Sequence, residues 1–335
     1  RIAAYAALQA IEHAALPEEL VRDTRTAMII GHGGCMQDVY KQCDDFEHGR
    51  SLPGSALQRV MCDTVSANLS ILFGTRGYSF TVSAACATGA AAIGQAYQLI
   101  QWGLQDRALC GGAMESTWEF ASHFDALKAL SLREDAPEKA SRPFDRGRDG
   151  LVPSGGGSIL VLEEWEAARA RGAPIRAELV GYCFASDAFD MTAPSGEGGL
   201  RAMRGALEAA GLAPGDVDYV NAHATSTPVG DVVEARAIEQ LFVRGGARGP
   251  RVSSTKSMSG HEGSASGANE IVYTALMMEG GFIAPNINLE ELDPRCAGIT
   301  IVANEALDEP IETAVSNAFG FGGVNTCLVL RRFGG

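Results

Sequence analysis

The chain has no long hydrophobic run and comparatively little positive charge. No apolar stretch approaches the roughly 20 residues that a membrane-spanning helix needs, and the first residues lack the pattern of a signal peptide. Lysine and arginine number 27 against 41 aspartates and glutamates, which gives a formal net charge of −14. This balance argues against a nucleic-acid binder, which needs a basic face. We therefore expect neither a membrane nor a nucleic acid among its partners.

Paired cysteines are also missing. The eight cysteines are scattered, none forms a Cys-x-x-Cys pair, and most lie in apolar sequence. This pattern predicts neither a zinc site nor a disulfide framework, so we expect no metal and a reducing, cytoplasmic location. A cysteine in such a setting is ordinarily a small buried hydrophobic residue. A reactive one must therefore be identified from its sequence context.

Strand-like runs alternate with amphipathic or small-residue helices along the whole chain. Alternation of this kind predicts an α/β fold. The helices that we expect cover residues 2–14, 87–103, 198–210 and 232–241. The expected strands are 26–30, 78–82, 108–111, 158–162, 177–180, 219–222, 251–254 and 326–330.

A weak internal repeat divides the chain. In the second half a strand (176–181) precedes a helix, a proline turn, a second strand and then His223. The chain opens with the same order from the helix onward, but without the strand that should precede it. We predict two similar halves, 1–172 and 173–335, which meet at the stretch 169–174. The first strand–helix unit is expected to be missing at the N-terminus.

Cys86 stands where a strand runs directly into a helix rich in alanine and glycine. The free N–H groups and the dipole at a helix N-terminus favour a thiolate. They also stabilise an anion that forms on a bound thioester carbonyl. Cys86 is therefore a candidate nucleophile, although a packed core cysteine would explain this motif equally well by itself.

Two histidine motifs favour the reactive interpretation. His223 follows an apolar strand in Asn221-Ala-His-Ala-Thr, and His261 follows Lys256 in a second loop rich in glycine and serine. Both lie at expected strand C-termini, where doubly wound folds place their sites. A fourth motif, 316–325, sets glycines beside phenylalanines. It is typical of a turn whose backbone approaches a ligand, or of an ordinary turn between strands.

Taken together and in this order, the motifs resemble the β-ketoacyl-acyl carrier protein synthases of the thiolase superfamily, and most closely the bacterial type I synthases. The resemblance implies a thiolase-like, five-layered α-β-α-β-α fold of two pseudo-repeated halves. It implies an acyl carrier protein as partner, a homodimer or a heterodimer with a related ketosynthase-like subunit, and no cofactor. The further stretches that carry it are Ser83-Ala-Ala-Cys-Ala-Thr88, Trp118-Glu-Phe, Phe124-Asp-Ala-Leu, Pro137-Glu-Lys-Ala-Ser-Arg142, Phe144-Asp-Arg-Gly-Arg-Asp-Gly150, Ala193-Pro-Ser-Gly-Glu-Gly198 and Gly281-Phe-Ile-Ala-Pro-Asn-Ile287.

The resemblance also implies a reaction, the decarboxylative condensation of an acyl group with malonyl-acyl carrier protein in fatty-acid chain elongation. Cys86 would accept the acyl group, with the backbone N–H groups of Cys86 and Phe321 as the oxyanion hole. His223 and His261 would both donate N–H to the enolate oxygen left by decarboxylation. Lys256 would hold the His261 loop through Glu270.

The remaining assignments concern support and substrate binding. Asp231 and Glu234 would organise the His223 loop, and Thr225 and Thr227 would bind the pantetheine amides. The acyl pocket and its gate would be formed by Gly34, Phe319 and Phe321.

Two residues depart from the family pattern. Ala224 replaces the glycine that usually follows the first histidine, and Glu262 opens a stretch that is usually aliphatic. A carboxylate beside His261 would either raise the histidine pKa or face solvent, and we expect the second.

Three alternatives stay open. A ketosynthase of a specialised pathway, such as aryl-polyene or polyketide synthesis, would share the whole catalytic set, and the departure at Glu262 favours it. A thiolase would need a second catalytic cysteine in a Cys-x-Gly setting, which Cys327 does not have. A non-catalytic chain-length-factor-like subunit would lack the cysteine that this chain keeps at Cys86.

Overall fold

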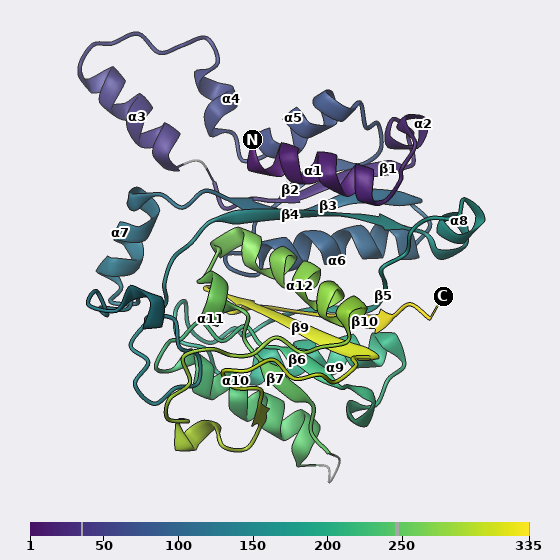
Figure 1. Cartoon of the computed structure of the whole chain (residues 1–335). Helices are drawn as coiled ribbons and strands as arrows, with labels where there is room; N and C mark the ends of the chain where they lie inside the picture. The colour runs from purple at the N-terminus through teal and green to yellow at the C-terminus, as the bar shows by residue number, and fades with distance from the viewer. Residues whose placement is uncertain (35, 245–247, 335) are drawn as a thin grey trace.

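The computed structural model describes residues 1–34, 36–244 and 248–334. Two β-sheets lie on either side of a central helical layer, formed by α6 (Thr88–Gln101) and α12 (Ser266–Gly280), and further helices cover the outer faces (Figure 1). The order of layers is α-β-α-β-α, as expected. Within the described ranges, no helix combines the length and the hydropathy needed to cross a membrane.

The first sheet has the strand order β2-β1-β3-β4. β1 pairs in parallel with β2 and β3, whereas β4 is antiparallel to β3. Helices α1 (Ile2–His13) and α5 (Thr64–Phe73) cover its outer face (Figure 1). The strands are β1 (Thr26–Gly31), β2 (Ser79–Val82), β3 (Arg107–Met114) and β4 (Gly156–Glu163).

The second sheet has the order β5-β10-β9-β6-β7-β8. Its outer face carries α9 (Glu197–Ala210) and α10 (Gly230–Ile238), and α10 continues into a π-helical turn, Glu239–Val243 (Figure 1). The strands are β5 (Ala177–Ser186), β6 (Tyr219–Asn221), β7 (Arg251–Ser253), β8 (Thr300–Ile301), β9 (Thr313–Gly320) and β10 (Val324–Arg332). Shorter helices complete the chain: α2 (Glu18–Val21), α3 (Met36–Glu47), α4 (Ala56–Val60), α7 (Trp118–Ala126), α8 (Trp165–Ala170) and α11 (Lys256–Ser259).

The two sheets repeat one another strand by strand. The series β2-β1-β3-β4 corresponds to β7-β6-β9-β10, with the same parallel, parallel and antiparallel pairings. The chain passes from the first sheet to the second between Glu163 and Ala177. The carboxyl ends of β6 and β7, together with the turn before α6, therefore open toward the same region of the molecule.

The predicted helices and strands agree with the structure except at the C-terminal end. The motif 316–325, expected as a turn, is largely strand: β9 runs to Gly320, and only residues 321–323 form the turn before β10. β8 was also not predicted, because it has only two residues. β9 is buried through most of its length, so it lacks the alternation of polar and apolar residues that reveals a half-exposed strand.

Candidate active site

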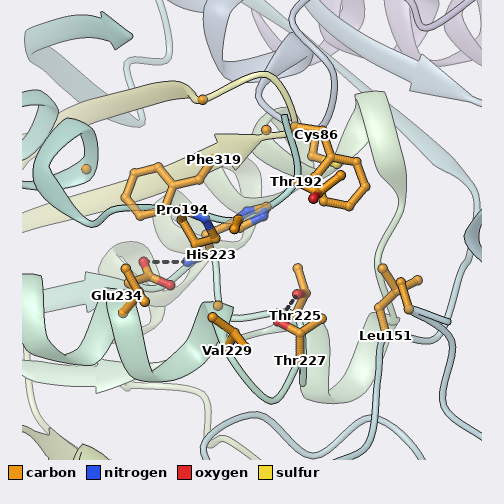
Figure 2. Close-up of a pocket in the computed structure, with 18 of the residues that line it drawn as sticks. Cys86, Leu151, Thr192, Pro194, His223, Thr225, Thr227, Val229, Glu234 and Phe319 are labelled. Carbon is orange, nitrogen blue, oxygen red and sulfur yellow. Dashed lines mark hydrogen bonds between the residues drawn. The ribbon is translucent and has the colours of Figure 1, made fainter. Parts of the chain in front are cut away.

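A pocket of about 450 Å³ contains most of the residues singled out in the sequence. Cys86, His223, His261, Phe319 and Phe321 all line it. Figure 2 shows Cys86, His223 and Phe319 close together, with the two threonines of the His223 loop farther along the cavity. The site therefore draws on both sheets, and on residues more than 200 positions apart in the chain.

A tight turn presents Cys86 at the start of α6. β2 ends at Val82, Ala85 takes a left-handed conformation with φ 48°, and the helix begins two residues after the cysteine. Thr88 fastens the turn, because its hydroxyl accepts from the N–H of Ala84 (2.8 Å) and donates to the carbonyl of Ala85 (2.6 Å). A non-glycine residue with positive φ is strained, and such strain persists where surrounding bonds fix the backbone.

Burial of Cys86 opposes the thiolate that the N–H groups at the helix N-terminus favour. Burial raises the pKa of Cys86 to about 11. Lys256 and the backbone N–H groups of Phe321 and Cys86 act in the opposite direction, but they do not overcome the loss of solvation. Those two N–H groups are nevertheless directed at the sulfur, which is the arrangement that an oxyanion hole at this position requires.

The His223 loop is fixed by two buried carboxylates of α10. Glu234 accepts from the N–H groups of His223 (2.9 Å) and Ala224 (2.7 Å), and the first of these bonds is drawn in Figure 2. Asp231 accepts from the N–H of Thr227 (3.1 Å). Burial raises the pKa of Glu234 to about 7 and that of Asp231 to about 6. Both carboxylates are thus hydrogen-bonded to backbone N–H groups of this loop.

His261 lies against His223 and within the electrostatic influence of a buried ion pair. The two imidazole rings have centroids 5.5 Å apart and meet edge to face. The ion pair joins Lys256 to Glu270, and both side chains are about 1% exposed. Burial raises the pKa of Glu270 to about 8, whereas Lys256 lowers it.

Both histidines are neutral at neutral pH. Burial and then Lys256 lower the pKa of His261 to about 3. The same two causes, followed by His261, hold the pKa of His223 well below its usual range. A neutral imidazole has one N–H donor and one acceptor nitrogen, so each ring can either donate to an oxyanion or accept a proton.

The residues assigned to substrate binding divide into two groups. Thr225 and Thr227 line the pocket and share a hydrogen bond of 3.3 Å, and both phenylalanines line it as well. Gly34 does not. It is exposed with φ 110°, and a Cβ placed there would meet nothing within 4 Å, so the assignment of Gly34 to the acyl pocket is not supported within this chain.

The expectation for Glu262 is wrong. Its side chain is only 3% exposed, so it does not face solvent. It accepts hydrogen bonds from Ser266, Asn269 and Tyr273, all on α12. It does not raise the pKa of His261 either, because burial and Lys256 lower that pKa.

The sequence analysis assigned no role in the pocket to several residues that line or support it. The loop after β5 contributes Met191, Thr192 and Pro194, and Phe124 contributes its ring from α7. Asn317 of β9 donates to Glu234 (3.0 Å) and so steadies the His223 loop from the neighbouring strand. The signal for Asn317 was a side-chain amide close to the apolar residues Val315, Ala318 and Phe319, since an amide needs a hydrogen-bond partner when buried.

Comparisons with known proteins show which family the chain resembles along its length. The models of the β-ketoacyl synthase N-terminal and C-terminal domains match residues 1–168 and 176–290. The chain is 46% identical to 3-oxoacyl-[acyl-carrier-protein] synthase 1 of Haemophilus influenzae, over 99% of this chain and 82% of that one.

Solved structures extend the likeness to the fold. A β-ketoacyl synthase from Burkholderia phymatum superposes with a TM-score of 0.94 at 39% identity, covering 99% of this chain and 81% of that one. A type II polyketide ketosynthase, solved in complex with its acyl-carrier protein and bound to the hexaketide, gives a TM-score of 0.91 at 30% identity, with 99% and 84% covered.

A metal site is not evident among the described residues, because no group of three or more His, Cys, Asp or Glu side chains is arranged to hold an ion. The pocket is lined by a thiol and two imidazoles, and backbone N–H groups are directed at the sulfur. With domain matches along most of the chain and a relative 46% identical over 99% of it, the chain belongs to the β-ketoacyl synthase family.

Proposed function

We propose that the protein catalyses the decarboxylative Claisen condensation of an acyl group, held on Cys86, with malonyl-acyl carrier protein in fatty-acid chain elongation. One observation carries the proposal. Cys86 opens into a pocket with two neutral histidines, and the N–H groups of Cys86 and Phe321 are directed at its sulfur. This combination supplies a nucleophile, an oxyanion hole and imidazoles for two half-reactions.

In the first half-reaction the Cys86 sulfur attacks an acyl thioester, and the resulting oxyanion is held by the two backbone N–H groups. Losing one such donor typically costs about a hundred-fold in rate. In the second, malonyl-acyl carrier protein loses carbon dioxide, and the enolate carbon attacks the acyl group on Cys86. Between them, His223 and His261 can accept the thiol proton and donate an N–H to the enolate oxygen. This division into two steps predicts ping-pong kinetics.

The proposed partner is an acyl carrier protein, which the names of the relatives include. A pantetheine arm is long and carries two amides, so hydroxyls along the pocket suit it. Thr225 and Thr227 line the pocket, which supports this role, and Lys128 is a basic residue of the same lining. A homodimer, or a heterodimer with a related subunit, in the cytoplasm is part of the same proposal, as is catalysis by the side chains without a cofactor.

Transfer of a labelled acyl group, followed by peptide mapping, tests the nucleophile. We expect label on Cys86 and none in the Cys86→Ala variant. Cys183→Ala is the matched control, because Cys183 is a half-buried free cysteine that does not line the pocket. Label on a different cysteine of the wild-type protein would refute the assignment.

A specialised pathway is the second candidate, and two observations favour it. A polyketide ketosynthase is among the structural neighbours, and Glu262 occupies a stretch that is usually aliphatic. Comparison of saturated and polyenoyl acyl carriers as substrates separates the two functions. A thiolase is disfavoured, because Cys327 is buried in β10 and does not line the pocket that contains Cys86.

A further inference from the structure

Arg148 is a buried arginine whose guanidinium binds the backbone of the loop after β6. Its Nε donates to the carbonyl of Thr227 (2.9 Å), and its Nη2 donates to the carbonyl of Pro228 (2.8 Å). Its Nη1 donates to Asp293 (2.9 Å) and to the carbonyl of Asp145 (2.7 Å). The side chain is only 1% exposed, and it does not line the pocket. Arg148 therefore acts on the loop rather than on a molecule in the pocket.

Thr227 is held at both of its backbone polar groups. Its carbonyl accepts from Arg148, and its N–H donates to Asp231 (3.1 Å). The same carboxylate accepts from the N–H of Phe144 (2.9 Å) and lies 3.5 Å from the guanidinium, with both side chains at most 1% exposed. A buried polar network whose members are bonded in this way makes the backbone rigid. The loop is thus tied to a segment 79 positions earlier in the chain.

Ser226 is turned away from the pocket, whereas its two neighbours line it. Its backbone is left-handed, with φ 68°, and its completely buried hydroxyl accepts from the N–H of Arg142 (3.0 Å). A non-glycine residue keeps such a conformation only where its surroundings fix it. The bonds from Arg142 and Arg148 supply that constraint, so Thr225 and Thr227 both lie at the cavity (Figure 2).

The paired hydroxyls match the hydrogen-bonding groups of an amide. Thr225 donates to Thr227 over 3.3 Å, the bond drawn between them in Figure 2. A hydroxyl has one hydrogen and two lone pairs, so the pair still offers one O–H donor and free acceptor positions. A pantetheine amide presents one carbonyl and one N–H. Hydrogen bonds weaken steeply when they are misaligned, so the pair binds an amide only while the loop keeps its shape.

We propose that Arg148 is a positioning residue for substrate binding, which holds the backbone of Thr227 and Pro228 so that the two threonine hydroxyls bind a pantetheine amide. The inference rests on the function proposed above, and it separates the residues that bind the carrier arm from those that react.

The reacting groups are fixed independently of Arg148. Glu234 accepts from the backbone N–H of His223, and Thr88 fastens the turn that presents Cys86. Among the described residues, no hydrogen bond joins Arg148 to Cys86 or to either histidine of the pocket. A change at Arg148 should therefore weaken the binding of the pantetheine arm and leave the intrinsic reactivity of the thiol unchanged.

The Arg148→Lys variant tests this role, because it keeps the buried charge and changes the geometry of the donors. The positive charge has to stay, since the completely buried Asp231 lies beside it. A lysine ammonium is a point charge, so it cannot span two successive carbonyls and a carboxylate as the planar guanidinium does. Arg146→Lys is the matched control, because the Arg146 side chain is 64% exposed and pairs with Glu291.

The measurement compares acylation of Cys86 by two donors, an acyl-pantetheine and the ethanethiol ester of the same acyl group, which has no amide. In Arg148→Lys we expect kcat/KM for acyl-pantetheine to fall about tenfold, roughly the contribution of one hydrogen bond. The loss should appear as a higher KM with kcat retained. The rate with the ethanethiol ester should stay within about twofold of the wild type. A general loss of folded protein would lower both rates equally, so their ratio isolates the positioning role.

A double-mutant cycle shows whether Arg148 acts through Thr227. Thr227→Val removes the hydroxyl, and in that background Arg148→Lys should lower the rate with acyl-pantetheine by less than about twofold. Ser226→Ala, which removes the acceptor of the Arg142 N–H, takes the place of Arg148→Lys if that variant does not fold. An equal loss with both donors, or an undiminished effect in the Thr227→Val background, would overturn the proposal.

Titration of the protein with free pantetheine tests the positioning without any reaction. We expect Arg148→Lys to bind pantetheine about tenfold more weakly than the wild type and Arg146→Lys to bind it equally well. Equal affinity of wild type and Arg148→Lys would also overturn the proposal. A wild-type protein that accepts an acyl group from neither donor would instead refute the proposed function, and the titration would still decide the role of Arg148.

Discussion

At the scale of single residues, the environment of Cys86 decides its chemistry more than its position on a helix. The helix N-terminus, two backbone N–H groups and Lys256 all favour the thiolate, yet burial outweighs them and raises the pKa to about 11. A pocket that excludes water protects an acyl-enzyme from hydrolysis. Because the same burial raises the pKa of the thiol, a base must accept its proton. The neutral imidazoles beside it are suited to that task.

Removal of the buried ion pair should make Cys86 less reactive. Lys256 is the largest influence that lowers the Cys86 pKa, and Glu270 raises it more weakly. The Lys256→Met/Glu270→Gln double variant leaves no unpaired charge, and it should raise that pKa further. We expect Cys86 to be alkylated by iodoacetamide about threefold to tenfold more slowly at pH 8, since one pKa unit changes the thiolate fraction about tenfold.

Peptide mapping of the alkylated protein measures this rate at each cysteine. Cys62 is exposed and serves as an internal reference whose rate should not change. Faster alkylation of Cys86 in the double variant would show that Lys256 does not favour the thiolate.

At the scale of elements, the close approach of α6 and α12 positions the nucleophile against the second histidine. Gly89 makes this approach possible. A Cβ at this position would lie 2.9 Å from the backbone nitrogen of Ala268 and 3.0 Å from the carbonyl oxygen of Ser264. Backbone atoms cannot move aside as a flexible side chain can, so the helices would have to separate.

Gly89→Ala should therefore destabilise the protein although alanine is the better helix former. The intrinsic gain is at most about 1 kcal/mol, whereas overpacking typically costs about 1–3 kcal/mol. We expect a lower free energy of unfolding in urea and slower acylation of Cys86. Gly54→Ala is the control, because a Cβ there meets nothing within 4 Å. Equal stability of the two variants would contradict this account of the packing.

At the scale of the whole molecule, the chain and its expected partner protein carry net charges of the same sign and should repel each other. The chain carries −14, and an acyl carrier protein is expected to be acidic as well, so a local basic residue at the pocket should matter. Lys128→Glu should lower kcat/KM for acyl carrier protein about tenfold at low salt, with a smaller effect at high salt. Transfer from a short acyl-pantetheine should be unaffected, because it does not require the protein–protein contact.

Lys41→Glu provides the matched control for that experiment. Lys41 is an exposed lysine of α3 and does not line the pocket. An equal loss in both variants would mean that net charge, rather than a site at the pocket, governs the encounter.

The buried histidines should also make stability depend on pH. The pKa of His261 is about 3 in the folded protein, below its usual value near 6.5, so the unfolded chain binds the proton first as the pH falls. The stability contributed by the neutral ring is fully present above about pH 6.5 and is lost as the pH falls toward 3. Urea unfolding at pH 7 and pH 4.5 should show a loss larger by about 2–3 kcal/mol in the wild type than in His261→Gln. The same loss in both proteins would contradict this assignment.

The sequence by itself determined the family, the layered α/β fold and most of the site. Cys86, His223, Lys256 and His261 could be predicted because each stands in a short local motif at the end of a strand or the start of a helix. Such positions follow from backbone connectivity, which local sequence encodes. The order of the strands in both sheets brings those ends together, so Cys86, His223 and His261 line one pocket, and Lys256 is buried.

Only the tertiary structure decided the protonation of these groups and the residues that support them. Solvent exclusion depends on everything packed around an atom, so the raised pKa of Cys86 was not visible in its motif. Glu262 was predicted to face solvent, because its hydrogen-bond donors lie one to three helical turns away on α12. Those donors are directed at the carboxylate only in the folded chain. Gly34 was predicted to line the acyl pocket, yet a Cβ placed there would meet nothing within 4 Å in the folded chain. Burial and hydrogen-bond direction arise from contacts between distant segments, and a linear pattern does not record them.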